Sequence, residues 1–257
     1  MVLPRMATLV IGDLHGCGME FNELLGIARR DRVDARIILL GDLFTKGPRP
    51  DLVVETISEL RAGGRRVESV CGNHDLRLMD ALRKHDAGAS LDDLAPAEAY
   101  AIRVLDRAGK LTAARRILTE TISKTYIQGQ GWAVVHGGID PQLGLAGTSD
   151  FEKIHKKAAP GRAHWWESYN GEDGLLIVGH KPLFEPLVLR RDGNPIVVNV
   201  DTGCAYGGFL TAYCIEEDRL IMVASKQPAR DGFGATPVAT APRWASGGPV
   251  RTFVRRP

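Results

Sequence analysis

The sequence of 257 residues lacks several features that mark whole classes of protein. Basic and acidic side chains nearly balance, at 33 against 31, so the cationic excess that duplex DNA or an anionic membrane surface selects is missing. No apolar run approaches the roughly 20 residues that span a bilayer. The apolar stretch at residues 6–11 is too short for the core of a signal peptide. We therefore expect a cytoplasmic protein with neither duplex DNA nor a membrane among its partners.

Cysteine and aromatic residues are also scarce. The four cysteines, Cys17, Cys71, Cys204 and Cys214, are widely separated and include no C-x-x-C pair of the kind found in zinc or redox sites. Reduced, buried thiols are the expectation. With 44% apolar, 25% charged and 6% aromatic residues, the composition is that of an ordinary globular chain.

Short apolar runs and helical segments alternate in the first third of the chain. The runs at residues 7–11, 36–40 and 67–71 each end in glycine followed by a polar residue, and residues 20–30 and 51–62 have helical spacing of apolar positions. This order predicts a largely parallel sheet with right-handed crossovers. Ligands of such sheets bind at the carboxyl ends of the strands, where the polar residues stand.

The rest of the chain is predicted to be helical first and strand-rich afterwards. Residues 75–124 are expected to be helical, with one amphipathic helix whose apolar face contains Leu94, Ala97, Tyr100, Ala101, Val104, Leu105 and Ala108. Strands are expected at residues 132–135, 175–178, 187–189, 196–200 and 210–223, the last broken by a turn at 216–219. We predict an α/β fold with two packed sheets flanked by helices. Its domain spans residues 1–225, with a helical cap at about 76–128, and an extended or disordered tail follows at 226–257.

Glycine, aspartate, asparagine and histidine gather at the predicted strand ends. The sequence is GDLHG at residues 12–16, GD at 41–42, GNHD at 72–75, HGG at 136–138 and GH at 179–180. Each motif alone is weak, because Gly-Asp is a common turn and a single histidine is usually structural. Four of the seven histidines fall in these motifs, however, and the sheet topology brings them together.

These residue types indicate a site for divalent metal ions. Carboxylate, amide and neutral imidazole donors suit Mn, Fe, Co or Zn. Six such donors exceed what one catalytic ion with open positions needs, whereas two ions sharing a bridging carboxylate would use them all. A two-metal centre can generate a bridging hydroxide and stabilise both attacking and leaving oxygens during in-line attack at phosphorus.

Together the motifs resemble the calcineurin-like metallophosphoesterases, over about residues 8–211 and in the same order. The resemblance implies a four-layer sandwich of two mixed sheets between helices, and two divalent ions, with Mn preferred and Co, Fe or Zn as alternatives. It also implies the role of each residue. Asp13 and His15 would bind the first ion, Asp42 would bridge, Asn73, His136 and His180 would bind the second ion, and His74 would be the general acid.

Details of the motifs favour one branch of this family. Residues 41–48 read GDLFTKGP, whereas serine/threonine protein phosphatases usually have GDxxDRG. The motifs GNHDL at 72–76 and DTGCAYGGFLT at 201–211 resemble those of bacterial diadenosine tetraphosphatases. We therefore expect hydrolysis of diadenosine tetraphosphate to two ADP by a metal-bridging hydroxide. The alternatives are asymmetric cleavage, RNA-cap hydrolysis, dephosphorylation of a phosphoprotein, and a metal-binding scaffold without activity. The oligomeric state stays open.

Several residues have two possible roles. Lys46 stands where the resemblance implies a phosphate-binding arginine, and a lysine there can neutralise phosphate without the bidentate geometry. Thr45 replaces the aspartate that would orient the general acid, a role left to Asp75 or to another residue. Trp165 and Trp166 could stack on a nucleobase or pack in the core. A further set of basic residues could reach a polyphosphate or form a solvated helix face: Arg103, Arg107, Lys110, Arg115 and Arg116.

Overall fold

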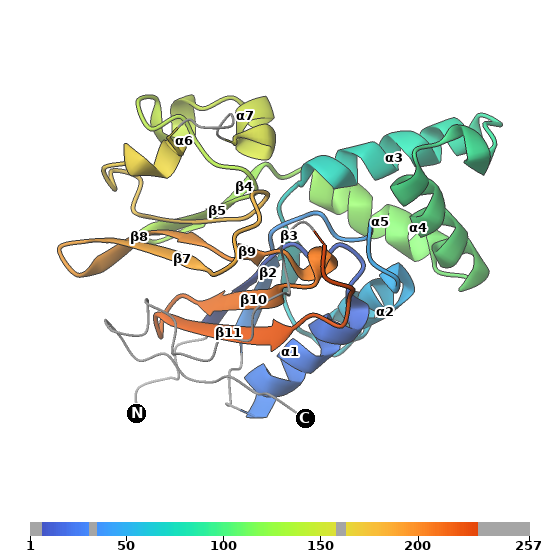
Figure 1. Ribbon diagram of the computed structural model, residues 1–257, viewed down its shortest axis with the longest axis horizontal. Coiled ribbons are helices and arrows are strands. Elements are labelled where there is room, and N and C mark those ends of the chain that lie inside the picture. The colour runs from blue at the N-terminus through green and yellow to red at the C-terminus, as the bar shows by residue number, and fades with distance from the viewer. Residues whose placement is uncertain (1–6, 31–34, 158–162, 231–257) are drawn as a thin grey trace.

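The computed structural model describes residues 7–30, 35–157 and 163–230, so residues 231–257 of the expected tail lie outside the described part. Two β-sheets stack on one another, and helices cover their outer faces (Figure 1). This is the expected mixed α/β arrangement of two sheets flanked by helices. None of the helices described combines the length and apolarity needed to cross a bilayer.

The first sheet has the order β11-β10-β1-β2-β3, with β9 paired to β10. Strands β1 (Ala7–Ile11), β2 (Ala35–Leu39) and β3 (Val67–Ser69) are parallel, as predicted from their apolar runs. The antiparallel strands are β9 (Asp201–Thr202), β10 (Phe209–Cys214) and β11 (Arg219–Ala224). The connecting helices are α1 (Gly18–Arg30) and α2 (Pro50–Ala62).

The second sheet has the order β4-β5-β6-β8-β7. Strands β5 (Trp132–Val135), β6 (Leu175–Val178) and β8 (Asn194–Asn199) are parallel, and β4 (Tyr126–Gly129) and β7 (Leu187–Arg191) pair antiparallel at the two edges. The short helices near this sheet are α6 (Gly144–Gly147), α7 (Asp150–His155) and the 3-10 turn η2 (Trp165–Glu167). A further 3-10 turn, η3 (Cys204–Tyr206), precedes β10.

Alternate residues of the strands divide the core into layers. Val10 of β1 packs with Val134 and Ile177 of the second sheet, whereas its neighbours Leu9 and Ile11 pack with the helices on the other face. Because side chains point alternately to the two faces of a strand, runs that are apolar throughout can be buried on both sides. The strand sequences therefore account for four layers: helices, sheet, sheet, helices.

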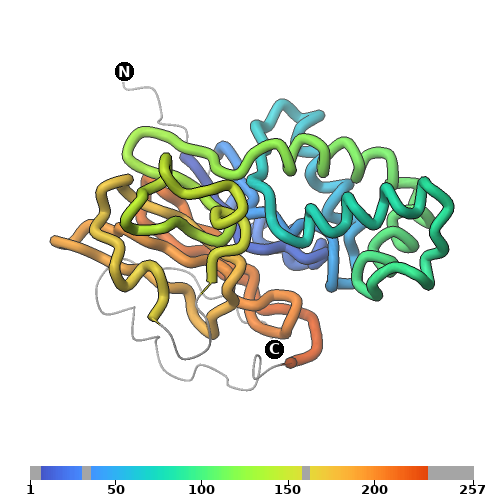
Figure 2. Tube along the Cα trace, turned by 90° about the horizontal axis from the view of Figure 1, so that it is seen from above, coloured from blue at the N-terminus to red at the C-terminus, as the bar shows by residue number. Residues whose placement is uncertain are grey.

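Helices α3 (Asn73–Asp86), α4 (Pro96–Arg107) and α5 (Leu111–Ile122), with the 3-10 turn η1 (Leu91–Asp93), gather at one end of the molecule (Figure 2). The buried face of α4 matches the predicted one in part. Ala101 and Leu105 are buried as predicted. Glu98 and Ile102 are also buried, whereas Tyr100 and Ala108 are exposed, so the buried face is rotated relative to the predicted one.

The basic side chains of this helical region mostly have acidic partners. Arg115 pairs with Asp86 at 2.7 Å, Arg103 with Asp92 at 3.6 Å and Lys110 with Glu55 at 3.9 Å, while Arg107 and Arg116 are exposed. For the three paired residues, the structure supports the interpretation that they form a solvated face of the helices.

Glu68 of β3 joins three parts of the first sheet's edge. Its carboxylate accepts hydrogen bonds or ion pairs from Arg36, Arg66 and Lys124 at 2.7–3.2 Å. Although burial opposes ionisation, these cations lower the pKa of Glu68 to about 2. The network holds β2 and β3 to the segment that leads into the second sheet.

Candidate active site

The predicted site residues follow strands of both sheets. Asp13 follows β1, Asp42 follows β2, and Asn73 begins α3 just after β3. From the second sheet, His136 follows β5 and His180 follows β6. His180 contacts Asp13 and His136 contacts Asn73, so the carboxyl ends of the strands of both sheets converge on one place.

Asp13, His15 and Asp42 form the first group of donor atoms. Their ligating atoms all lie within 4.8 Å of one another, and all three side chains are buried. His15 Nε2 is 3.4 Å from Asp42 Oδ2. The main-chain N–H of His180 donates to Asp13 Oδ2 at 3.2 Å, which links the first sheet's loop to that of the second.

Asp42, His136 and His180 form the second group, again with all ligating atoms within 4.8 Å. His136 Nδ1 donates to the carbonyl oxygen of Leu40 at 2.6 Å. The hydrogen is therefore on Nδ1, and the lone pair of Nε2 faces Asp42 Oδ1 at 3.7 Å and Asn73 Oδ1 at 3.4 Å. The two groups share Asp42, whose two carboxylate oxygens face histidines of different groups.

The electrostatics of the site fit divalent cations. Burial lowers the pKa of His15 well below its usual value, and it lowers that of His180 to about 3, so both rings are neutral and can act as ligands. Burial, with the nearby carboxylates of Asp201 and Asp42, raises the pKa of Asp13. His180 Nε2 is buried and has no hydrogen-bond partner among the residues that the structure describes. Crowded buried carboxylates and an unpartnered imidazole nitrogen are groups that a metal ion would satisfy.

Two positions require glycine because the main chain passes close to the carboxylates of Asp42 and Asp13. A Cβ at Gly72 would stand 2.2 Å from Asp42 Oδ1, and one at Gly179 would stand 2.3 Å from Asp13 Oδ1. No other residue leaves room for these oxygens. The glycines that mark the sequence motifs thus have a steric function at the site.

Strained backbone is concentrated in the same loops. Six described residues other than glycine have positive φ, and four of them are His15 (43°), Asp42 (50°), Lys46 (71°) and His180 (65°). Such conformations cost of order 1 kcal/mol or more each and persist where the surrounding structure holds them.

Asp75 supports the turn that carries Asp42. Its buried carboxylate accepts from the main-chain N–H groups of Asp42 at 2.8 Å, Leu43 at 2.9 Å and Gly72 at 2.9 Å. The suggestion that Asp75 orients His74 is therefore wrong, since its oxygens are engaged by the backbone. Asp75 instead stabilises the turn that carries Asp42, and we call this role a brace.

His74 lies in the first turn of α3, beside both groups. Its main-chain N–H donates to Asp42 Oδ1 at 2.8 Å, and its ring meets the His15 ring edge-on, with centroids 5.1 Å apart. Nδ1 of His74 lies 3.8 Å from Oε1 of Glu98 on α4. Glu98 was not among the predicted site residues, although its spacing of three and four residues from the buried Ala101 and Ile102 was a usable signal.

Lys46 places its ammonium group at the first donor group. Nζ lies 2.9 Å from His15 Nε2 and 5.3 Å from the centre of the Tyr206 ring. The hydroxyl of Thr45 lies 3.4 Å from His15 Nδ1. The location of Lys46 favours the functional reading over a solvated lysine.

The two tryptophans are part of the core. Trp165 and Trp166 are each 7% exposed and pack on the outer face of the second sheet, so they pack in the core as one of their two predicted roles requires. His164 stacks on Trp166 with ring centres 4.2 Å apart.

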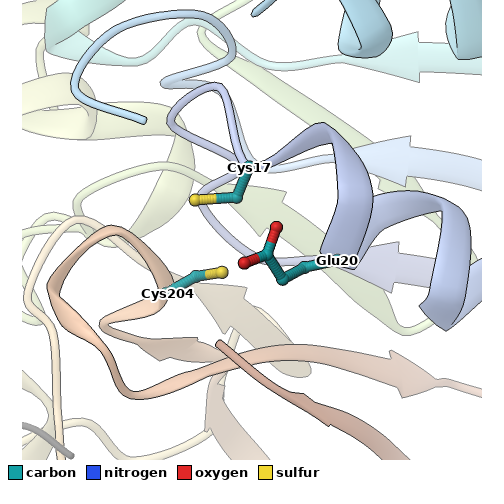
Figure 3. A group of neighbouring side chains, drawn as sticks. All are labelled: Cys17, Glu20 and Cys204. Carbon is teal, nitrogen blue, oxygen red and sulfur yellow. The ribbon is translucent and has the colours of Figure 1, made fainter. Parts of the chain in front are cut away.

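A separate buried cluster consists of Cys17, Glu20 and Cys204, with the Glu20 carboxylate pointing towards both sulfurs (Figure 3). Glu20 Oε1 accepts from Lys226 N at 2.7 Å and from Gln227 Nε2 at 3.0 Å. Contact with Cys17 and burial raise the pKa of Cys204, so this thiol stays protonated. All four cysteines are free and buried, as expected. The cluster holds the segment after β11 against α1.

Comparison with known proteins agrees with this geometry. Residues 6–217 match the calcineurin-like phosphoesterase family, and the chain belongs to that family. It is therefore a hydrolase of phosphate bonds, of a class that uses divalent metals in a dinuclear centre.

Among its relatives is the "Bis(5'-nucleosyl)-tetraphosphatase, symmetrical" of Janthinobacterium sp. (strain Marseille), 26% identical over 88% of this chain and 99% of that protein. The "Bis(5'-nucleosyl)-tetraphosphatase PrpE [asymmetrical]" of Anoxybacillus flavithermus is 29% identical over 85% of this chain and 94% of that protein. A crystal structure described as a candidate diadenosine tetraphosphatase superposes with a TM-score of 0.64 at 22% identity, covering 87% of this chain and 96% of that one. A metallophosphoesterase from Sphaerobacter thermophilus gives 0.54 at 21% identity, with 86% and 88% covered. These two structures support the fold.

Proposed function

We propose that the protein hydrolyses dinucleoside tetraphosphates, with diadenosine tetraphosphate as the substrate and two ADP as the products. The observation that carries the proposal is the carboxylate of Asp42 shared between two buried groups of metal-compatible donors. Both curated relatives named above are bis(5'-nucleosyl)-tetraphosphatases and are matched over at least 94% of their length.

Two divalent ions, with Mn preferred, would fit the two donor groups. Asp13 and His15 would hold the first ion, Asn73, His136 and His180 would hold the second, and Asp42 would contribute to both. When bound, the ions activate water and stabilise negative charge on the phosphoryl oxygens. His74 gives the proton on Nε2 to the leaving oxygen, because its ring lies beside both groups without belonging to either. Lys46 supplies a further positive charge that attracts phosphate.

The position of cleavage distinguishes two forms of this activity. Symmetric hydrolysis yields ADP alone, whereas asymmetric hydrolysis yields ATP and AMP. The relatives include enzymes named for each outcome. We favour symmetric cleavage on the motifs GNHDL at 72–76 and DTGCAYGGFLT at 201–211.

Chromatography of the products tests the proposal. The protein loaded with Mn²⁺ is incubated with diadenosine tetraphosphate and, in parallel, with a phosphopeptide. ADP as the sole nucleotide product supports the proposed symmetric cleavage. Formation of ATP and AMP would show that cleavage is asymmetric. Release of phosphate from the peptide alone would overturn the proposal. Asp42→Asn is the matched control, since loss of the carboxylate shared by both groups should abolish turnover of every substrate.

A further inference from the structure

A histidine that donates a proton must present one particular ring nitrogen to the leaving group. The main-chain N–H of His74 is held by its hydrogen bond to Asp42, and its ring packs edge-on against the ring of His15. Neither contact determines which ring nitrogen carries the hydrogen or stops the ring from flipping. That requires a partner at the nitrogen that faces away from the substrate.

The nitrogen that needs this partner is Nδ1. It is buried and has no partner at hydrogen-bond distance within the described residues. Glu98 Oε1 lies 3.8 Å from it, and the two side chains are only 14% and 6% exposed. The separation is longer than a hydrogen bond, but catalytic hydrogen bonds in ligand-free structures are often long and shorten in the substrate complex.

The location of Glu98 is unusual for a glutamate. It lies in the first turn of α4, after Pro96, on the buried face that also contains Ala101 and Ile102. A buried carboxylate needs a cationic or hydrogen-bonding partner. Contact with His74 is the largest influence on its pKa, which is lowered despite burial, so the side chain is an anion that can accept a hydrogen bond.

Asp75 and Thr45, the two residues considered from the sequence for orienting His74, have other hydrogen-bond partners. Asp75 accepts three main-chain N–H groups, and Thr45 faces His15. Glu98 comes instead from the helical region inserted between β3 and β4, far from the metal-binding motifs in sequence.

We propose that Glu98 is a positioning residue for His74, accepting the Nδ1 hydrogen so that Nε2 faces the leaving oxygen. The inference rests on the proposed function, in which His74 is the acid. As the bond from phosphorus to the leaving oxygen breaks, the Nε2–H bond breaks and an O–H bond forms on that oxygen. The imidazolium becomes neutral imidazole with its hydrogen on Nδ1, and Glu98 stays ionised throughout.

Leaving-group dependence separates this role from a structural one. A general acid matters most when the leaving oxygen is strongly basic, as in phenyl phosphate, and little when it is weakly basic, as in 4-nitrophenyl phosphate. We expect Glu98→Gln to lower kcat on phenyl phosphate by about tenfold or more with KM little changed, and to lower it much less on 4-nitrophenyl phosphate. Asp106→Asn, which alters an exposed carboxylate on the same helix, should change neither.

Two further measurements address the mechanism directly. Because Glu98 acts through His74, adding Glu98→Gln to His74→Asn should cause no further loss on phenyl phosphate. Nitrogen-15 spectra of the histidine side chains in the zinc-loaded protein should show the neutral His74 ring with its hydrogen on Nδ1. In Glu98→Gln the tautomers should mix, since an amide can present either oxygen or N–H to the ring.

The outcomes distinguish this inference from the proposed function. Wild-type protein inactive on every phosphate substrate would reject the proposed function. An active wild type that is impaired by His74→Asn but not by Glu98→Gln would reject the inference alone. Equal losses by Glu98→Gln on both aryl phosphates, or multiplied losses in the double variant, would also reject it in favour of a structural role. Thermal unfolding of each variant identifies a loss due to misfolding, and Glu98→Asp, which keeps the charge, should then recover part of the rate on phenyl phosphate.

Discussion

Asp75→Asn tests whether the site depends on the brace beneath Asp42. The wild-type carboxylate accepts from Asp42 N and Gly72 N through Oδ2, and from Leu43 N through Oδ1. Asparagine has nearly the same shape, and its oxygen can keep the two bonds at the Oδ2 position. Its NH₂ group then faces the N–H of Leu43, so one hydrogen bond is lost and two donors oppose each other.

The expected loss of stability follows from these bonds. A hydrogen bond to a charged group contributes about 1.5–3 kcal/mol, and a buried donor left unsatisfied costs a similar amount. An opposing effect reduces the loss, because burial and the charge of Asp42 raise the pKa of Asp75 to about 7, so the ionised form is itself costly there. We expect the free energy of unfolding to fall by about 1–2 kcal/mol. Asp75→Ala, which leaves all three donors unsatisfied, should cost more, about 3 kcal/mol or above.

Urea unfolding in the presence of a chelator measures this loss without a contribution from bound metal. The same variant should need more Mn²⁺ for half-maximal activity, because the turn holding Asp42 at φ 50° is loosened. Asp80→Asn on the same helix is the control, since its exposed pair with Lys84 should contribute no more than about 0.5 kcal/mol. If Asp75→Asn matched the wild type in urea and in its Mn²⁺ requirement, the bracing role would be refuted.

Three other predictions address the metal groups and the sheet edge. His136→Ala should lose bound metal with activity, whereas His74→Ala should lower kcat with metal content intact; elemental analysis of both variants decides, and equal metal loss would contradict the assignment. Gly72→Ala places a Cβ 2.2 Å from Asp42 Oδ1, so it should lower kcat by about 100-fold at saturating Mn²⁺; a wild-type kcat would mean that Asp42 need not stay in place. Glu68, with a pKa lowered to about 2, should add stability that is fully present above its unfolded value near 4.5 and is lost as the pH falls through about 2. Urea unfolding of the wild type and Glu68→Gln should therefore differ by about 2–3 kcal/mol at pH 7 and by about half as much at pH 3; a gap that did not shrink would show that ionisation of Glu68 is not its source.

Local pattern was enough to predict most of the sheet structure. Strand β6 is a continuous apolar run, and β1 and β2 each end in three consecutive buried apolar residues, because these segments are buried on both faces. Strand β4 was missed because Tyr126, Gln128 and Gly129 are exposed and only Ile127 is buried, which leaves no apolar run to detect. Edge strands of this kind are defined by pairing with a neighbour and not by their own composition.

Some residues of the candidate site could likewise be predicted from local pattern, and others could not. The donors Asp13, Asp42 and His136 were predictable because each directly follows or closely follows a strand, and strand ends converge by topology. The contacts of Asp75 and Glu98 were not predictable, since each depends on how separate loops and helices pack. For Asp75 the partner is a turn 33 residues earlier in the chain, and for Glu98 it is a histidine on another helix.

The left-handed conformations of His15, Asp42, Lys46 and His180 have a consequence for how this protein changes under mutation. Glycine adopts such angles without strain, so replacing any of the four with glycine relieves local strain while it removes a side chain to which we assign a function. Under the proposed function, selection for activity alone maintains these residues against changes that the fold tolerates. Gene copies released from that selection should lose the chemistry first and keep the sandwich, leaving stable proteins with glycine where ligands once stood.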